Sequence, residues 1–220
     1  MIALSNVSAY TRKGRERTAI LDDVSVVFGA RQRVGILAPA SSGKTTIARL
    51  LSRIDKPRSG NVLVEGRVSW PLGLAGFLHP ELTGAMNVAI VAETLGEDPA
   101  DVLAFCTRLT GQADGFKQIT KNYSPTVRAG LAFALSLARP CDHFIADDKI
   151  AIGDGDARER FSAMLDQRLE TAGLVFLSRN ARSLEKACSR FFVLHRAKLI
   201  EVDAAQTAAD VLEEAARQNA

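Results

Sequence analysis

The sequence predicts an α/β protein built on a mainly parallel β-sheet. Short apolar runs of strand length alternate along the chain with longer segments of helical periodicity. Several of these runs are almost continuously hydrophobic, which is typical of strands that helices bury on both faces. One run leads into a loop of small residues that ends in Gly43-Lys44-Thr45 and then into a helix, an order typical of phosphate-binding α/β proteins.

The apolar runs place the strands in chain order. We expect them at 24–28, 34–38, 62–64, 144–146, 174–177 and 191–194. The first expected helix spans 45–54, because Ile47, Leu50, Leu51 and Ile54 recur at helical spacing and form one apolar face.

Further helices follow between the later strands. One begins after Asp98, with Pro99 at its first position, and ends at Gly111, which are the usual capping residues of a helix. Apolar positions at helical spacing predict another around 161–169, and the Ala- and Glu-rich stretch 207–217 predicts a last one. We interpret about 83–140 as a helical subdomain inserted into the core of a single domain that spans 1–220.

The composition excludes several classes of protein. With 47% hydrophobic and 24% charged residues, the chain is neither disordered nor collagen-like. Its 28 Lys and Arg residues against 25 Asp and Glu residues leave a net charge of +3, so we expect no nucleic-acid partner. The longest run of apolar and small residues, near 129–138, falls short of the roughly 18 residues that span a bilayer.

The cysteines indicate a compartment. Cys106, Cys141 and Cys188 lie far apart and outside any paired motif, so we expect free thiols in a reducing environment. The sequence therefore predicts a soluble cytoplasmic protein, which could still dock on a membrane protein.

The loop after the second expected strand predicts a nucleotide phosphate site of the Walker A kind. Its candidate binding residues are Ala38, Pro39, Ala40, Ser41, Ser42, Gly43, Lys44, Thr45 and Thr46. Backbone N–H groups and the helix N-terminus attract phosphate, Lys44 neutralises its oxygens, and the Thr45 hydroxyl is a ligand for Mg²⁺. Ala38 replaces the first glycine of the usual pattern, so we expect a negative or mildly strained φ there.

A second anchor is the apolar run 144–146, which ends in Asp147 and Asp148. Ligands of open α/β sheets lie beyond the carboxyl ends of the strands. Asp147 is therefore a candidate Mg²⁺ ligand, and Asp148 a candidate base that polarises an attacking water. The alternative is a polar loop that merely follows a core strand.

Several further stretches carry a resemblance to a known family. They are Lys56-Pro57-Arg58-Ser59-Gly60, Ser69-Trp70-Pro71-Leu72-Gly73, His79-Pro80-Glu81-Leu82-Thr83-Gly84, Tyr123-Ser124 with 129–138, and Ile150-Ala151-Ile152-Gly153-Asp154. In order and spacing the chain resembles the ATP-binding subunits of ABC transporters. Among these it is most similar to the branch that exports capsular and O-antigen polysaccharide.

The resemblance implies an ABC ATPase-like P-loop NTPase core with an antiparallel β subdomain and a small helical subdomain. It also implies ATP and Mg²⁺ as cofactors, and a head-to-tail dimer that encloses two ATP molecules. The partner would be an integral-membrane permease, and this chain would be peripheral on the cytoplasmic face of the inner membrane. In this scheme Tyr10 stacks on adenine, and Asp154 lies in the inter-subunit loop.

The chain departs from the family at its catalytic positions. His79 stands where a glutamine usually senses Mg²⁺ and water, Asp148 replaces a glutamate, and Arg179 replaces a histidine that contacts the γ-phosphate. Ser124 keeps the signature serine, but Pro125 follows it instead of a glycine-containing segment and has no N–H for a phosphate. We therefore expect slow hydrolysis.

Each candidate residue also has a purely structural interpretation. Tyr10 could be an edge-strand tyrosine, Ser124 a local helix cap, and Asp154 a solvated loop residue. His79 could belong to the permease interface, and Arg179 could be a surface residue before a helix capped by Ser183.

Two other functions remain open at this point. The chain could hold ATP without hydrolysing it, as a regulatory or structural subunit paired with an active sister ATPase. A kinase or GTPase is a further alternative. A GTPase should carry an Asn-Lys-x-Asp guanine motif, and we find none. A kinase should carry a lid with arginines that bind the substrate phosphate, but Arg108 is the one arginine in the helical stretch 83–121.

Overall fold

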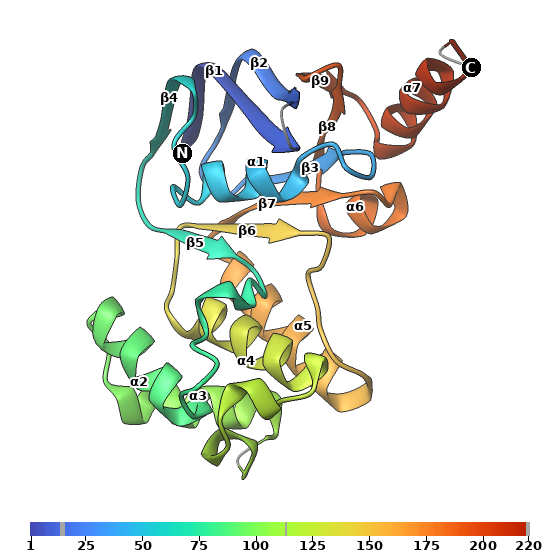
Figure 1. Ribbon diagram of the computed structural model, residues 1–220. Helices are drawn as coiled ribbons and strands as arrows, with labels where there is room; N and C mark the ends of the chain where they lie inside the picture. Colours follow the sequence, from blue (N-terminus) through green and yellow to red (C-terminus); the bar gives the residue numbers. More distant parts are fainter. Residues whose placement is uncertain (14–15, 113, 219–220) are drawn as a thin grey trace. The chain divides into compact units, whose positions relative to one another are not determined.

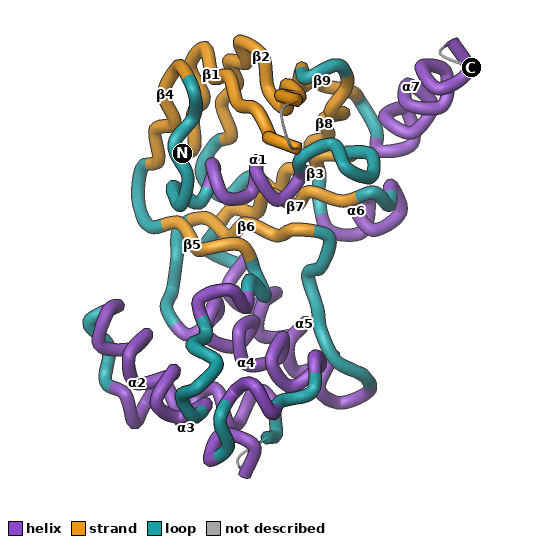
Figure 2. The backbone as a smooth tube through the Cα atoms, in the orientation of Figure 1, coloured by secondary structure: helices purple, strands orange, loops and turns teal. Residues whose placement is uncertain are grey.

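The computed structural model describes residues 1–13, 16–112 and 114–218. The chain divides into two compact units. Unit 1 comprises residues 1–71, 141–148 and 171–220, and unit 2 comprises residues 72–140 and 149–170. All the named strands belong to unit 1, whereas unit 2 is built from helices (Figure 2). That the whole chain acts as one ATP-binding domain stays a prediction.

Unit 1 contains an antiparallel sheet of three strands in the order β2-β1-β4. The strands are β1 (Ile2–Lys13), β2 (Glu16–Phe28) and β4 (Ser59–Val64). Both neighbours pair with β1 in antiparallel register, with Ala3 opposite Val27 on one side and Leu63 on the other. One face of this sheet is buried, through Ile2, Leu4 and Val7 among others.

The second sheet of unit 1 has six strands in the order β5-β6-β7-β3-β8-β9. Its members are β3 (Arg33–Leu37), β5 (Val68–Pro71), β6 (His143–Asp147), β7 (Gly173–Ser178), β8 (Arg190–His195) and β9 (Lys198–Val202). All neighbouring pairs are parallel except β8 with β9. The predicted α/β class and its mainly parallel sheet are confirmed.

Helices cover this sheet. Helix α1 (Lys44–Leu51) lies between the two sheets of unit 1 (Figure 1), and its buried Ile47, Leu50 and Leu51 belong to one core with residues of both. Helix α6 (Ala181–Ala187) contacts β3 and β7, and α7 (Ala205–Gln218) contacts β8 and α6. The core thereby fixes where β3 ends and α1 begins.

Unit 2 packs around helix α4 (Pro125–Ala138). Its other helices are α2 (Gly84–Leu95), α3 (Pro99–Thr110) and α5 (Gly155–Leu169), with short 3₁₀ turns η1 (Ala75–Phe77), η2 (Asp114–Lys117) and η3 (Thr120–Asn122). Phe133 of α4 and Phe161 of α5 meet edge to face, with ring centroids 5.2 Å apart. Of the described helices, none combines the length and apolarity that crossing a bilayer requires.

Some elements differ from those expected. Helix α1 ends at Leu51, not at residue 54, because Arg53 adopts φ 57° and turns the chain; Ile54 is 41% exposed. The expected caps of α3, Asp98 and Gly111, are confirmed. As expected, the three cysteines form no disulfide, but only Cys106 is fully buried, and burial raises its pKa to about 12.

Candidate functional site

The phosphate loop of unit 1 joins β3 to α1. Ala38 is buried and donates its N–H to the Ser178 carbonyl at 2.9 Å, which extends the pairing of β3 with β7. As expected, Ala38 is not among the residues with positive φ, whereas Ser41 has φ 60° and Gly43 has φ 90°. The sharp turns of this loop therefore lie later than its first residue.

Gly43 is required by both conformation and space. It caps α1 in a left-handed conformation, which glycine adopts without steric cost. A Cβ at Gly43 would lie 2.7 Å from the side chain of Ile20 in β2, closer than carbon atoms approach without strain. Strand β2 thus packs against the loop, a contact that motif spacing alone does not reveal.

Lys44 is held inside the loop. Its side chain is 8% exposed, and Nζ donates to the Pro39 carbonyl at 3.3 Å and lies 3.6 Å from Oδ2 of Asp148. Asp148 follows β6 with φ 61°, and its N–H donates to the Leu177 carbonyl at 2.8 Å. The two predicted residues are therefore brought together, as an ion pair at the carboxyl end of the sheet.

Thr45 and Asp147 meet beside this pair. The Thr45 hydroxyl donates to Oδ2 of Asp147 at 2.6 Å. Oδ1 of Asp147 is buried without a hydrogen-bond partner, and a buried carboxylate oxygen left unpaired is costly. A hydroxyl and a carboxylate with a free oxygen fit Mg²⁺, which takes one or two carboxylates together with water and substrate phosphate.

In the described part of the chain, a larger cluster of metal-ligating side chains is not found. Among the residues that the structure describes, no three His, Cys, Asp or Glu side chains cluster as a metal site. Mg²⁺ does not require such a cluster, because substrate phosphates complete its coordination. The fit of Thr45 and Asp147 to Mg²⁺ is unaffected.

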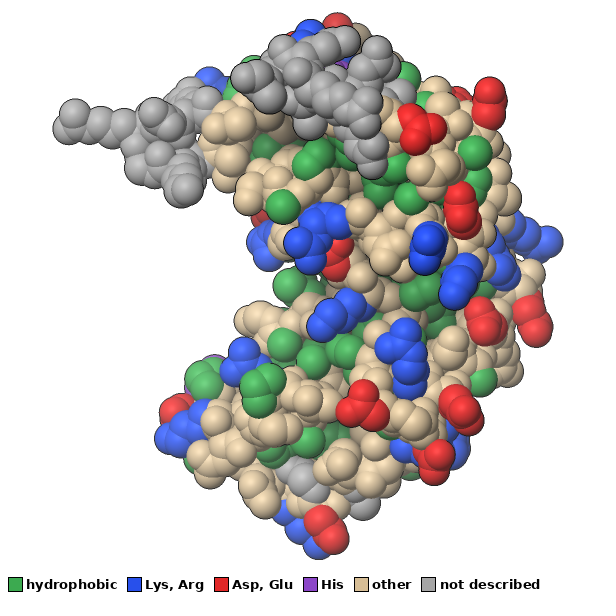
Figure 3. Space-filling model, turned by 90° about the vertical axis from the view of Figure 1, so that its right-hand side faces the viewer, with side chains coloured by type: hydrophobic (Ala, Val, Ile, Leu, Met, Phe, Trp, Pro, Cys, Tyr) green, Lys and Arg blue, Asp and Glu red, His purple; other side chains and the backbone are tan. Residues whose placement is uncertain are grey.

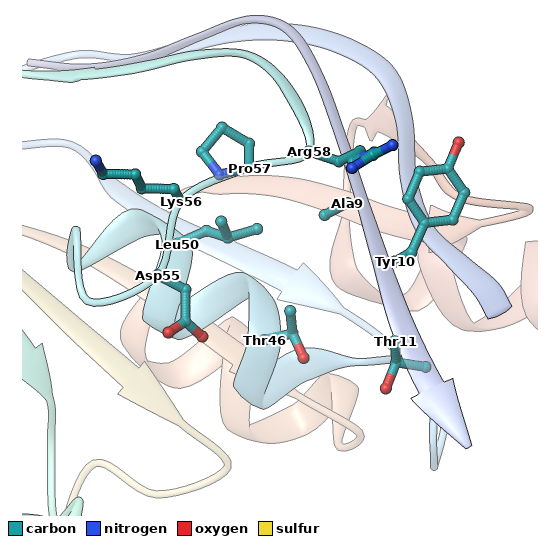
Figure 4. A pocket seen from close by; sticks show the side chains of 9 residues that line it. All are labelled: Ala9, Tyr10, Thr11, Thr46, Leu50, Asp55, Lys56, Pro57 and Arg58. Carbon is teal, nitrogen blue, oxygen red and sulfur yellow. The ribbon is translucent and has the colours of Figure 1, made fainter. Parts of the chain in front are cut away.

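A cavity of about 550 Å³ lies alongside α1 (Figure 4). It is lined by Tyr10 and its neighbours in β1, by Thr46 and Leu50 of α1, and by residues 55–58. Tyr10 is 45% exposed, so its ring is accessible to a ligand. Asp55 and Arg58 were not among the expected site residues, although they lie in the turn that follows the phosphate loop and its helix.

Arg179 follows β7 in unit 1 and is exposed. The helix after it is capped by Asn180, whose side-chain oxygen accepts from the Ser183 N–H at 3.2 Å. The expectation that Ser183 is the cap is wrong, because Ser183 already lies inside the first turn of α6 and supplies the N–H that is capped.

The remaining candidates lie in unit 2. His79 is exposed, and its Nδ1 accepts from the Glu81 N–H at 3.3 Å. In the neutral ring this bond leaves the proton on Nε2, so that nitrogen can donate but not accept. Ser124 caps α4 as expected and accepts from the Val127 N–H at 3.2 Å. Asp154 precedes α5 without a side-chain capping bond.

Charge is mixed on the surface. On the face drawn in Figure 3, Lys and Arg side chains are interspersed with Asp and Glu. No single sign of charge dominates this face, which agrees with the small net charge of +3.

Solved structures identify the fold. A dimeric, post-hydrolysis structure of the ATP-binding cassette MJ0796 with ADP and phosphate matches with a TM-score of 0.77 at 18% identity, over 92% of this chain and 98% of that one. A structure described as the ATP-binding subunit of an ABC transporter gives a TM-score of 0.78 at 15% identity, over 96% and 93%. The fold is that of an ABC ATPase cassette.

Curated relatives define the family, although no protein-family model matches. The O-antigen export ATP-binding protein RfbB of Klebsiella pneumoniae is 30% identical over 92% of this chain and 84% of its own. The polysialic acid transport ATP-binding protein KpsT of Escherichia coli is 29% identical over 89% and 90%. This chain belongs to the family of ATP-binding subunits of ABC polysaccharide exporters, and the resemblance read from its motifs is confirmed.

Proposed function

We propose that this chain binds ATP with Mg²⁺ at its phosphate loop and energises the export of a capsular or related cell-surface polysaccharide. The observation that carries the proposal is the joint placement of Lys44, Thr45 and Asp147 at the carboxyl end of the parallel sheet. Lys44 neutralises phosphate oxygens, while Thr45 and Asp147 hold the metal. These are the groups that bind a nucleoside triphosphate.

The protein acts with partners in this proposal. Two copies, or one copy and a sister ATPase, close around ATP, with Ser124 of each facing the nucleotide of the other. Closure drives a separate integral-membrane permease, so the chain is cytoplasmic and peripheral on the inner membrane. The dimeric cassette of similar fold and the exporters named among the relatives support this arrangement.

Hydrolysis is slow in this scheme. Asp148 orients the attacking water, but its carboxylate is one methylene shorter than that of the glutamate it replaces, and a misplacement of about 1 Å costs on the order of 100-fold in rate. Its oxygen also lies 3.6 Å from Lys44, so nucleotide binding must first break this ion pair. Arg179 binds phosphate bidentately without transferring a proton.

The non-hydrolysing subunit stays the second candidate, because specific contacts favour it. Nδ1 of His79 is already used by the Glu81 N–H, so the ring does not reproduce an amide that both donates and accepts. Pro125 removes an N–H at the start of α4. Both changes weaken catalysis without touching the phosphate loop.

Steady-state phosphate release from the complex with its permease decides between them. We expect slow turnover that Asp148→Asn and Lys44→Ala abolish, and that Lys149→Ala, an exposed neighbouring position, leaves unchanged. Bound ATP with no phosphate release would favour the non-hydrolysing subunit. Turnover unaffected by both Asp148→Asn and Lys44→Ala would refute the assigned catalytic site.

A further inference from the structure

Residues 79–83, here called the His79 loop, are hydrogen-bonded to the segment that leads into Ser124. Asn87 of α2 is 3% exposed and hydrogen-bonds to the backbone of His79 through both polar atoms of its side-chain amide. Its Oδ1 accepts from the His79 N–H at 2.7 Å, and its Nδ2 donates to the carbonyls of His79 at 3.2 Å and Thr83 at 2.9 Å. A buried amide with its donors and acceptor satisfied holds this loop in one conformation.

Thr120 fastens the same loop from the other side. It is 1% exposed, and its hydroxyl donates to the His79 carbonyl at 2.7 Å. Its N–H donates to the Leu82 carbonyl at 2.9 Å, and the Lys121 N–H donates to the Pro80 carbonyl at 3.0 Å. The Lys121 ammonium also pairs with Glu81 at 2.6 Å. Two segments about 40 residues apart in sequence therefore form one hydrogen-bonded body.

The chain from Thr120 to Ser124 is short and regular. The Tyr123 N–H donates to the Thr120 carbonyl at 3.1 Å, and Ser124 then caps α4. Tyr123 also packs against the first residue of α2, because a Cβ at Gly84 would overlap its hydroxyl. Hydrogen bonds therefore run from the His79 carbonyl through Thr120 to Tyr123, the residue before the Ser124 cap.

We propose that Asn87 and Thr120 are positioning residues that make the His79 loop and the Ser124 cap move as one body. The inference rests on the proposed function, in which Ser124 faces the nucleotide of the partner, and on the family resemblance, in which the position of His79 senses Mg²⁺ and water. The two residues then couple the position of one group to that of the other. Neither touches a nucleotide, and both act through the groups they hold.

Isosteric variants test the link. Thr120→Val removes the hydroxyl but keeps the volume, and Thr120→Ser restores the donor. The matched control is Thr110→Val, because Thr110 is also buried in unit 2 and its hydroxyl also donates to a backbone carbonyl at 2.7 Å, that of Cys106. Amide hydrogen exchange of the full chain, with and without ATP and Mg²⁺, is the readout.

In the wild type and in Thr110→Val we expect ATP to slow exchange in residues 38–46, 76–83 and 119–128. In Thr120→Val the phosphate loop is still protected, but the ATP-induced slowing at 119–128 falls about fivefold, the equivalent of one net hydrogen bond, and Thr120→Ser regains it. An ATP response at 119–128 that matches Thr110→Val would overturn the inference.

A failure of the proposed function would look different. If ATP protected no segment, including 38–46, then ATP binding itself would be refuted. Exchange without nucleotide would still decide the mechanical link. Faster exchange at both His79 and Val127 in Thr120→Val supports one body, and faster exchange at only one of them contradicts it.

Discussion

The ion pair between Lys44 and Asp148 predicts that removing the carboxylate strengthens ATP binding. In the chain without nucleotide, Nζ of Lys44 lies 3.6 Å from Oδ2 of Asp148, and phosphate must take the place of this oxygen. Asp148→Asn keeps the shape of the side chain, and asparagine tolerates the left-handed φ of 61° at this position. The variant therefore removes charge with little change of structure.

The size of the effect follows from the geometry. At 3.6 Å and an effective dielectric constant of about 20, the attraction is at most about 4.6 kcal/mol. Water and side-chain entropy reduce it, and exposed pairs contribute about 0.2–1 kcal/mol net. Because the Lys44 side chain is 8% exposed and that of Asp148 is 38% exposed, we take the upper end, about 1 kcal/mol. This corresponds to an ATP affinity about fivefold higher.

Isothermal titration with ATP in EDTA measures the gain without a metal contribution. The control is Asp203→Asn, which removes a carboxylate from an exposed position of unit 1 and is expected to leave affinity unchanged. The gain should shrink at high salt, because exposed charges are screened. An affinity for ATP that is unchanged or lower in Asp148→Asn would refute the competition between the carboxylate and phosphate.

Two further predictions concern stability. Gly43→Ala should lower the free energy of unfolding by about 1–2 kcal/mol for the left-handed φ and by about 1–3 kcal/mol for the overlap with Ile20. The control is Gly96→Ala, where φ is also positive but nothing lies within 4 Å of the added carbon. Urea denaturation should show a smaller loss of stability for this control. Equal losses would show that Ile20 does not constrain the loop. Burial, and then the positive Met1 amino group, lower the pKa of His143 in the folded chain. Below about pH 6.5 the unfolded chain therefore binds more protons than the folded chain. Stability decreases as the pH is lowered from there, until the pH passes below the pKa of the folded state. Urea denaturation at pH 7.5 and pH 5 checks this, and a His143→Gln variant that shows the same loss would contradict it.

The sequence predicted elements whose signal is local. Strand β3, the phosphate loop and the start of α1 are consecutive in sequence, and the strand is buried along almost its whole length, so one window contains the pattern. Strands β5 and β9 gave no such signal, because they are short, partly exposed and mix polar with apolar residues. Propensity and periodicity do not resolve strands of that kind.

The candidate site follows the same rule. Thr45 and Asp147 were each expected as Mg²⁺ ligands, because parallel strands deliver their carboxyl ends to one edge, but the hydrogen bond between them was not expected. The hydrogen bonds of Asn87 and Thr120 to the His79 backbone were not expected. A side chain that hydrogen-bonds to a distant backbone leaves no periodic pattern in the sequence. The contact of Ile20 with Gly43 was missed for the same reason, because it joins β2 to a loop by tertiary packing alone.

Titration of the purified chain with ATP, beside Lys44→Ala, shows whether the phosphate loop binds the nucleotide. We expect saturable binding by the wild type and an affinity about 10- to 100-fold lower in Lys44→Ala, the range that loss of a charge-assisted hydrogen bond gives. A wild-type chain that ignores millimolar ATP, or a Lys44→Ala variant that binds as tightly as the wild type, would contradict this expectation.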